Sequence, residues 1–147
     1  MKSLTVILCL VAFSLAGCSR APTKITPPKV HFGQDVCAQC AMIISDERFA
    51  GAIGLRRNGR VEHLLFDDVG EMLGFDPGEY DEIRWYATDA VTREWLDAET
   101  AVFLHSDELR TPMHTGVGVY STRDAAVAAQ QEYGGEILSF ADLRADL

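Results

Sequence analysis

The amino-acid sequence predicts an α+β fold built from two ββαβ units whose strands pair antiparallel. The first observation is a turn signal, Asn58-Gly59, between two strand-like apolar runs, because Asn-Gly in that setting strongly favours a hairpin. The second is that the order strand, strand, helix, strand occurs twice along the chain. We place the units at about residues 35–90 and 98–147, as two halves of one domain over residues 35–147.

The first unit is expected to contain a helix framed by three strands, at residues 49–55, 61–66 and 83–87. Asp67-Asp68 offers an N-cap, since an aspartate side chain accepts hydrogen bonds from the unpaired N–H groups of a helix start. Met72 and the apolar residues beside it keep a helical spacing, which assigns Met72 to the core, and Gly74 is a typical helix stop.

The second unit repeats this plan with strands at residues 101–105, 116–121 and 136–140. Its helix is expected to begin at about Thr122 and to end at Gly134-Gly135, with alanines recurring along one face between them. Five large aromatic side chains in or near the predicted strands are the core candidates: Phe66, Trp85, Trp95, Phe103 and Tyr120.

The N-terminus predicts an exported lipoprotein. Residues 1–17 form a short apolar run after Lys2, too short for a membrane-spanning helix but typical of a signal peptide. The run ends in Leu15-Ala16-Gly17-Cys18, which resembles the lipobox of bacterial lipoproteins and predicts Cys18 as the lipid attachment. We therefore expect a bacterial lipoprotein facing the periplasm. Ser19, in place of an aspartate, favours the outer over the inner membrane.

Residues 18–34 contain three prolines and no apolar periodicity, which predicts a flexible tether after the lipid.

The net charge of the chain restricts the kinds of partner that it can bind. The formal net charge is −9, and it becomes −10 once Lys2 leaves with the signal peptide. Such an acidic chain is a poor ligand for nucleic acid or for anionic lipid. No nucleic-acid partner is expected, and membrane attachment is assigned to the lipid alone.

A short stretch at the start of the domain holds Cys37, Cys40 and Met42. Thiolate and thioether sulfurs are soft donors that select Cu(I), zinc or the iron of iron–sulfur clusters, and a Cys-x-Met pair favours copper. Ala41 stands where c-type haem needs histidine, and no second cysteine pair completes a zinc site. Two alternatives stay open: an inert Cys37–Cys40 disulfide, and a thiol–disulfide oxidoreductase that uses the pair.

A second source of ligands is the predicted loop at residues 107–115, which contains Met113 and His114. A rigid scaffold often displays ligands on its loops, and a methionine away from either helix is hard to explain as a core residue. The chain has neither a Ser/His/Asp arrangement nor a phosphate-binding loop, so enzymatic activity is not expected. The other histidines are interpreted as surface or hydrogen-bonded residues: His31, His63 and His105.

Together these residues resemble the NosL-like copper-chaperone lipoproteins, accessory proteins in the maturation of nitrous oxide reductase. The resemblance covers nearly the whole mature chain and rests on the lipobox, Asp35-x-Cys37-x-x-Cys40-x-Met42, Asp46-x-Arg48-Phe49-Ala50, Phe66-Asp67, Met113 with Gly116, Asp124-Ala125 and Gly134 to Phe140. It implies two ββαβ units and Cu(I) held by Cys40, Met42 and Met113. It also implies delivery, through a membrane assembly complex, to the copper–sulfide centre of the reductase.

Two departures from the family pattern bear on the ligands. Ala41 replaces the usual glycine, so a positive φ is less accessible there and a small change of geometry is expected. Met113 is followed by His114-Thr115 before Gly116, which makes His114 a rival ligand. If the cysteine stretch is extended, alternation places Cys40 and Met42 on one face and offsets Cys37, which stays a possible ligand.

Overall fold

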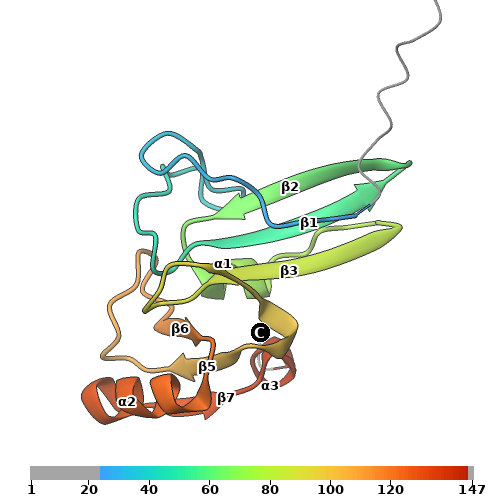
Figure 1. Ribbon diagram of the computed structural model, residues 1–147. Coiled ribbons are helices and arrows are strands. Elements are labelled where there is room, and N and C mark those ends of the chain that lie inside the picture. The colour runs from blue at the N-terminus through green and yellow to red at the C-terminus, as the bar shows by residue number, and fades with distance from the viewer. Residues whose placement is uncertain (1–23, 146–147) are drawn as a thin grey trace, which may run out of the picture.

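The computed structural model describes residues 24–145, which fold into two antiparallel sheets flanked by short helices (Figure 1). The first half contains β1 (Gly51–Arg57), β2 (Arg60–Phe66), α1 (Val69–Gly74), β3 (Glu82–Thr88), β4 (Trp95–Asp97) and the 3₁₀ helix η2 (Ala98–Thr100). The second half contains β5 (Val102–His105), β6 (Val117–Tyr120), α2 (Arg123–Tyr133), β7 (Glu136–Leu138) and α3 (Phe140–Ala145).

The two halves share one topology. The first sheet has the strand order β2-β1-β3-β4 and the second has the order β6-β5-β7. In each half the opening strand therefore lies in the middle, between the strand that follows it and the strand after the helix, and every described pairing is antiparallel. The predicted α+β fold of two ββαβ units is confirmed.

Local chemistry explains where the elements begin and end. Asn58 and Gly59 both have positive φ, as the tight turn between β1 and β2 requires. The Asp68 side chain accepts from the Gly70 N–H at 2.9 Å and caps α1. Thr122 caps α2 in the same way.

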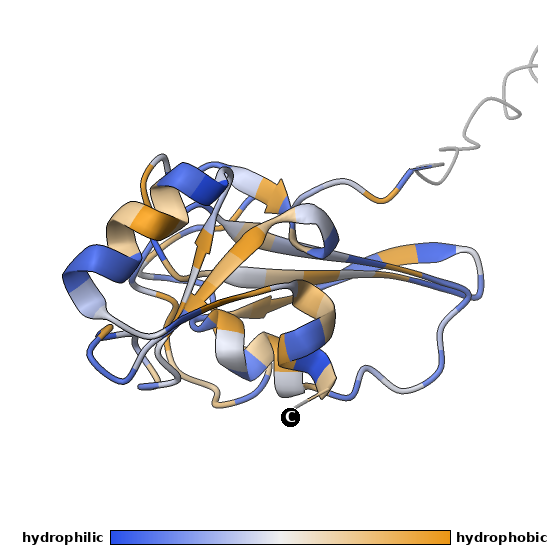
Figure 2. Cartoon of the chain, turned by 90° about the horizontal axis from the view of Figure 1, so that it is seen from below, coloured by the Kyte–Doolittle hydropathy of each residue, from blue (hydrophilic) through white to orange (hydrophobic). Residues whose placement is uncertain are grey.

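The core joins the two sheets, and four of the five aromatic candidates lie in it. Phe66, Trp85, Phe103 and Tyr120 are buried, whereas Trp95, on the short edge strand β4, is only partly buried. Met72 is fully buried, as its spacing predicts. Figure 2 shows hydrophobic colour along the central strands and mixed colour along the helices.

Three short elements were not predicted: β4, η2 and α3. The α3 helix follows β7 after one residue and packs Leu143 into the core. Phe140 meets Trp85 edge to face, with ring centroids 5.7 Å apart, and the Arg144 guanidinium lies 4.5 Å from the Trp85 ring centroid. Arg144 also donates to the Leu73 carbonyl at the end of α1. A helix of this length is held by such contacts rather than by its own periodicity.

Part of the expected tether belongs to the folded domain. Ile25 is 2% exposed and fills the space that a side chain at Gly54 would need. The Tyr86 hydroxyl donates to the Ile25 carbonyl at 3.0 Å, and a ring nitrogen of His63 lies 2.7 Å from the Thr26 carbonyl oxygen. Val30 and Phe32 also pack against the core. Residues 25–34 therefore lie against the folded domain, where the sequence predicted a flexible tether, because three apolar residues among the prolines anchor the segment.

The signal peptide, Cys18 and the tether up to residue 23 lie outside the described residues. Within residues 24–145, no helix combines the length and the apolar character that crossing a membrane requires.

Asp89 ties the two halves together just after β3. It is 1% exposed, and its carboxylate accepts from the N–H groups of Val91, at 2.7 Å, and of Ser121, at 2.8 Å. The neighbouring Ala90 N–H donates to the Val119 carbonyl at 2.8 Å. Burial raises the pKa of Asp89, but the donors at Ser121, Thr92 and Val91 outweigh burial, and the net pKa lies below the ordinary value of 3.8.

We expect Asp89→Asn to lower the free energy of unfolding at neutral pH by about 1–3 kcal/mol, because an amide cannot accept all three bonds. A lowered pKa gives stability that is complete above the ordinary pKa and is lost as the pH falls through the folded-state pKa. The melting temperatures of wild type and variant should therefore converge in acid. A gap that is the same at pH 7 and at about pH 3 would contradict this role of Asp89.

Candidate metal centre

The cysteine stretch forms a closed loop and not an extended strand. Val36 and Ile43 pair in an isolated antiparallel bridge, and the Cys37 N–H donates to the Met42 carbonyl at 2.8 Å. Inside the loop the Ala41 N–H donates to the Cys37 carbonyl at 3.0 Å, and Ala41 has a φ of 60°. The expected offset of Cys37 from Cys40 is therefore wrong, because the backbone turns between them.

The loop brings both thiols to one point together with a carboxylate from α1. One ligand atom from each of Cys37, Cys40 and Glu71 lies within 4.8 Å of the other two. Cys37 is buried and its Sγ donates to Glu71 Oε2 at 3.4 Å, while Cys40 and Glu71 are half-buried. Both cysteines are free thiols. This group, which we call the thiol cluster, is the only set of three His, Cys, Asp or Glu ligands found within residues 24–145.

The thiol of Cys40 is held protonated. Burial raises its pKa most, the Met42 backbone N–H opposes this, and hydrogen bonds with Cys37 and Glu71 raise it further, to about 11. At neutral pH the group is a thiol, so an incoming metal ion has to displace its proton. A raised pKa is also the opposite of what a nucleophilic redox cysteine needs.

Glu71 is not among the site residues that the sequence predicts. The pattern Asp68-x-x-Glu71 has the form of a capping box, in which the glutamate side chain reaches back to the start of its own helix. In the structure Glu71 turns instead to Cys37, 34 residues earlier in the chain. The sequence places Glu71 on α1 but says nothing of which distant loop lies against that helix.

The loop that carries Met113 is fastened to the same helix start. Oδ2 of Asp68 accepts from the Thr111 hydroxyl at 2.6 Å and from the Met113 N–H at 3.0 Å, and Oδ1 accepts from the Thr115 hydroxyl. Met113 is half-buried, and His114 is exposed with a φ of 58°. Met113 from the second half is thus brought to the helix that holds Glu71.

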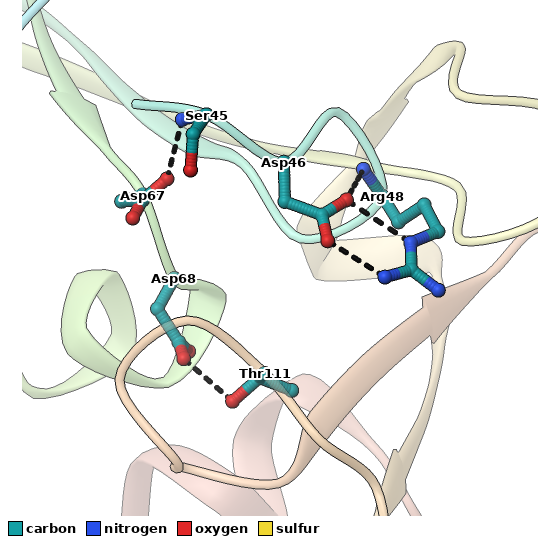
Figure 3. A network of polar contacts seen from close by, with 6 residues as sticks. All are labelled: Ser45, Asp46, Arg48, Asp67, Asp68 and Thr111. Atoms are coloured by element: carbon teal, nitrogen blue, oxygen red, sulfur yellow. Dashed lines mark hydrogen bonds and ion pairs between the residues drawn. The ribbon is translucent and has the colours of Figure 1, made fainter. Parts of the chain in front are cut away.

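A neighbouring aspartate fastens the end of the cysteine loop. Asp67 is 3% exposed and accepts from the Ser45 N–H at 2.9 Å. Figure 3 shows Asp67 reaching towards Ser45 and Asp68 reaching towards Thr111, on either side of the junction between β2 and α1. Beyond the loop, Arg48 forms a two-bond ion pair with Asp46 on the surface. Two adjacent carboxylates therefore hold the two candidate ligand loops.

The comparisons with known proteins agree with this fold. The NosL family model matches residues 29–147, most of the chain. The chain belongs to the NosL family. A crystal structure described as the copper chaperone NosL from Shewanella denitrificans superposes with a TM-score of 0.68 at 18% identity, over 81% of this chain and 96% of that one. A search of curated proteins finds no match. The matched range of this chain contains both cysteines, Met42, Glu71 and Met113.

The other predicted ligands of this NosL-family chain are more exposed than the buried thiol of Cys37. Met42 follows Cys40 by two residues and its side chain is 45% exposed. Met42, Met113 and His114 stay predictions as ligands. Each of the two ligand loops contains one non-glycine residue at positive φ, Ala41 and His114, a conformation that proteins often retain at functional sites.

Ala41→Gly should raise the stability of the metal-free protein by up to about 1 kcal/mol, because glycine adopts a φ of 60° without the steric cost that a side chain incurs. A matched control is Ala38→Gly in the same loop. Ala38 is exposed and has no positive φ, so glycine there should only add entropy to the unfolded chain and lower the melting temperature. Destabilisation by both substitutions would contradict strain at Ala41.

Proposed function

We propose that this chain is a lipid-anchored Cu(I) metallochaperone that supplies copper for the copper–sulfide centre of nitrous oxide reductase. The observation that carries the proposal is the thiol cluster: two free thiols converge beside a solvent-open methionine, in a chain of the NosL family. Soft sulfur donors bind Cu(I) in preference to the hard ions that select oxygen.

In this proposal each residue of the site has a distinct role in binding Cu(I). The thiolates of Cys40 and Cys37 supply negative charge and the strongest bonds, and Met42 and Met113 supply thioethers that need not lose a proton. Glu71 is a hard oxygen donor, which Cu(I) disfavours. We therefore assign it a role in the metal-free protein, where it accepts the hydrogen bond of the Cys37 thiol and holds that side chain in place before the thiol loses its proton to bind copper.

The rim of the site suits the transfer of copper to another protein. Val36, Met42 and Ile43 belong to the cysteine loop and are each about half exposed, and they are among the few large apolar side chains that the described residues leave open. Exposed apolar groups around a site favour contact with a partner. We propose that the partner is the membrane assembly complex that passes copper on to the reductase.

The rival function, thiol–disulfide exchange by Cys37 and Cys40, has less support. The proximity of the two thiols permits a disulfide, but the high pKa of Cys40 leaves little reactive thiolate at neutral pH. A competition titration against a colorimetric Cu(I) chelator, run under reducing conditions, separates the two functions. A chaperone should compete for Cu(I), whereas catalysed exchange of a disulfide substrate without Cu(I) binding would establish the rival.

The lipid anchor is a separate prediction. Cys18→Ala should release the protein from the membrane fraction, or leave it unprocessed, because the described residues offer no spanning helix and the net charge opposes anionic lipid. The Cu(I) affinity should stay at the wild-type value, since Cys18 is predicted to carry the lipid and the proposed copper ligands lie in residues 37–113. Fractionation of cells that express each form provides the measurement. Membrane attachment of a Cys18→Ala protein whose signal peptide has been removed would refute the lipoprotein assignment.

A further inference from the structure

The carboxylate of Asp68, at the start of the helix that carries Glu71, accepts four hydrogen bonds. The exposed fraction of Asp68 is 0%, so its carboxylate depends on protein donors. Oδ1 accepts hydrogen bonds from the Gly70 N–H and the Thr115 hydroxyl, and Oδ2 accepts hydrogen bonds from the Thr111 hydroxyl and the Met113 N–H. Helix capping alone uses one of these bonds. The other three reach 43 to 47 residues along the chain to a loop of the other half.

We propose that Asp68 is a positioning residue for copper, which sets the separation between the thiol cluster and Met113. This inference rests on the proposed function, in which sulfur atoms from both loops bind one Cu(I). On the helix side, Asp68 fixes the first turn of α1, from which Glu71 reaches Cys37. On the loop side, it holds the backbone of Met113 itself.

The loop that carries Met113 packs closely against α1. A Cβ added at Gly70 would lie 2.4 Å from the Thr115 side chain, and a Cβ added at Gly116 would lie 2.3 Å from the Ser106 carbonyl oxygen. Gly70 therefore lets the loop lie close against α1, and Gly116 lets the end of the loop pack against Ser106 in its own half. The close contact at Gly70 and the bonds to Asp68 together hold the loop at the start of α1.

The geometry requires a carboxylate. Each oxygen of Asp68 faces one backbone N–H and one threonine hydroxyl. An amide would point its NH₂ group at one of these N–H groups and lose that bond, although the hydroxyl on that side can turn and accept. Asp68→Asn keeps the size of the side chain and should therefore lose the bond to the Met113 N–H on the Oδ2 side or the helix cap at Gly70 on the Oδ1 side.

Asp89→Asn is the matched control. Asp89 is equally buried, also spans the two halves and also accepts from several donors, but none of them lies in a ligand loop. Both variants should lower the melting temperature of the metal-free protein. Only Asp68→Asn should weaken Cu(I) binding, by about 10- to 100-fold in a chelator competition, as when a residue that orients a metal ligand is lost. It should also lower the sulfur count in copper X-ray absorption.

A double-mutant cycle with Met113→Leu tests the route of the effect. If Asp68 acts through Met113, the leucine substitution should cost much less Cu(I) affinity in the Asp68→Asn background than in wild type. Additive losses, or wild-type affinity and sulfur count in Asp68→Asn, would overturn the inference. Absence of Cu(I) binding in wild type would instead refute the proposed function.

Thr111→Val covers the case in which Asp68→Asn does not fold. It removes one donor to Oδ2 and the acceptor of the Gly116 N–H, and it leaves the bond to Gly70 that caps the helix. We expect a several-fold lower Cu(I) affinity, corresponding to the roughly 1 kcal/mol net value of one hydrogen bond, with the protein still folded at room temperature. Unchanged affinity and sulfur count in folded Thr111→Val would also overturn the inference.

Discussion

Replacing Cys40 with serine should remove most of the Cu(I) affinity, by more than the roughly 10- to 100-fold that loss of a residue supporting a ligand costs. A hydroxyl is a hard donor and stays protonated, so it replaces neither the charge nor the softness of a thiolate. Cys37→Ser should cause a loss of the same order, because the two thiols lie in one cluster and not on opposite faces of a strand. The measurement is competition with a colorimetric Cu(I) chelator.

The pH dependence of binding provides the control. Because the pKa of Cys40 is about 11, the thiol is protonated throughout the neutral range, and Cu(I) must displace that proton. Affinity should therefore fall as the pH falls, by about tenfold per pH unit for each proton displaced. Cys40→Ser should reduce this slope by one proton. A wild-type affinity that does not vary between about pH 6 and pH 8 would mean that copper does not bind a Cys40 thiolate.

Met113→Leu should weaken Cu(I) binding while the metal-free protein keeps nearly its full stability. Leucine preserves volume and apolarity, and such exchanges cost less than about 1.5 kcal/mol. The bond from residue 113 to Asp68 is made by the backbone N–H, so the substitution leaves the loop fastened. X-ray absorption at the copper edge should show one sulfur fewer than in wild type.

A second methionine provides the comparison. Met72 is fully buried on α1, and a Cβ added at Gly51 would lie 2.8 Å from its sulfur, so its surroundings are tightly packed. Met72→Leu should change the melting temperature and leave the copper signal unaltered. If Met113→Leu behaves like Met72→Leu, Met113 is a packing residue, and His114 becomes the leading candidate for a ligand from the second half.

The sequence predicted the features that depend on neighbouring residues. The Asn58-Gly59 turn, the Asp68 cap and the Thr122 cap are each set within a few residues, and all three are where the sequence places them. Strand ends differ from the predicted ones by at most two residues, because hydrogen bonding to a neighbouring strand decides where a strand stops. The turns and caps, with the apolar runs between them, were enough to predict two ββαβ units.

Features that depend on distant contacts could not be predicted. Glu71 joins Cys37 only because α1 packs beside a loop 34 residues earlier, and Ile25 is buried only because the first sheet offers the space at Gly54. The α3 helix has too few residues for a periodic pattern and depends on Trp85 and Leu73. The sequence supplied the candidate metal ligands Cys40, Met42 and Met113, with Cys37 and His114 as possible ones, but not which of them converge.

The contacts of Asp68 also bear on the order of events during folding. They close loops of 43 to 47 residues, and the entropy of such closure must be overcome before the bonds can contribute. The hairpin of β1 and β2 depends on local pairing and is able to form early. A chain still emerging during synthesis or export can therefore present both cysteines long before Met113 is in place. Under the proposed function, the complete set of sulfur donors exists only after the second half has docked, so we expect tight capture of copper to be delayed until folding is finished.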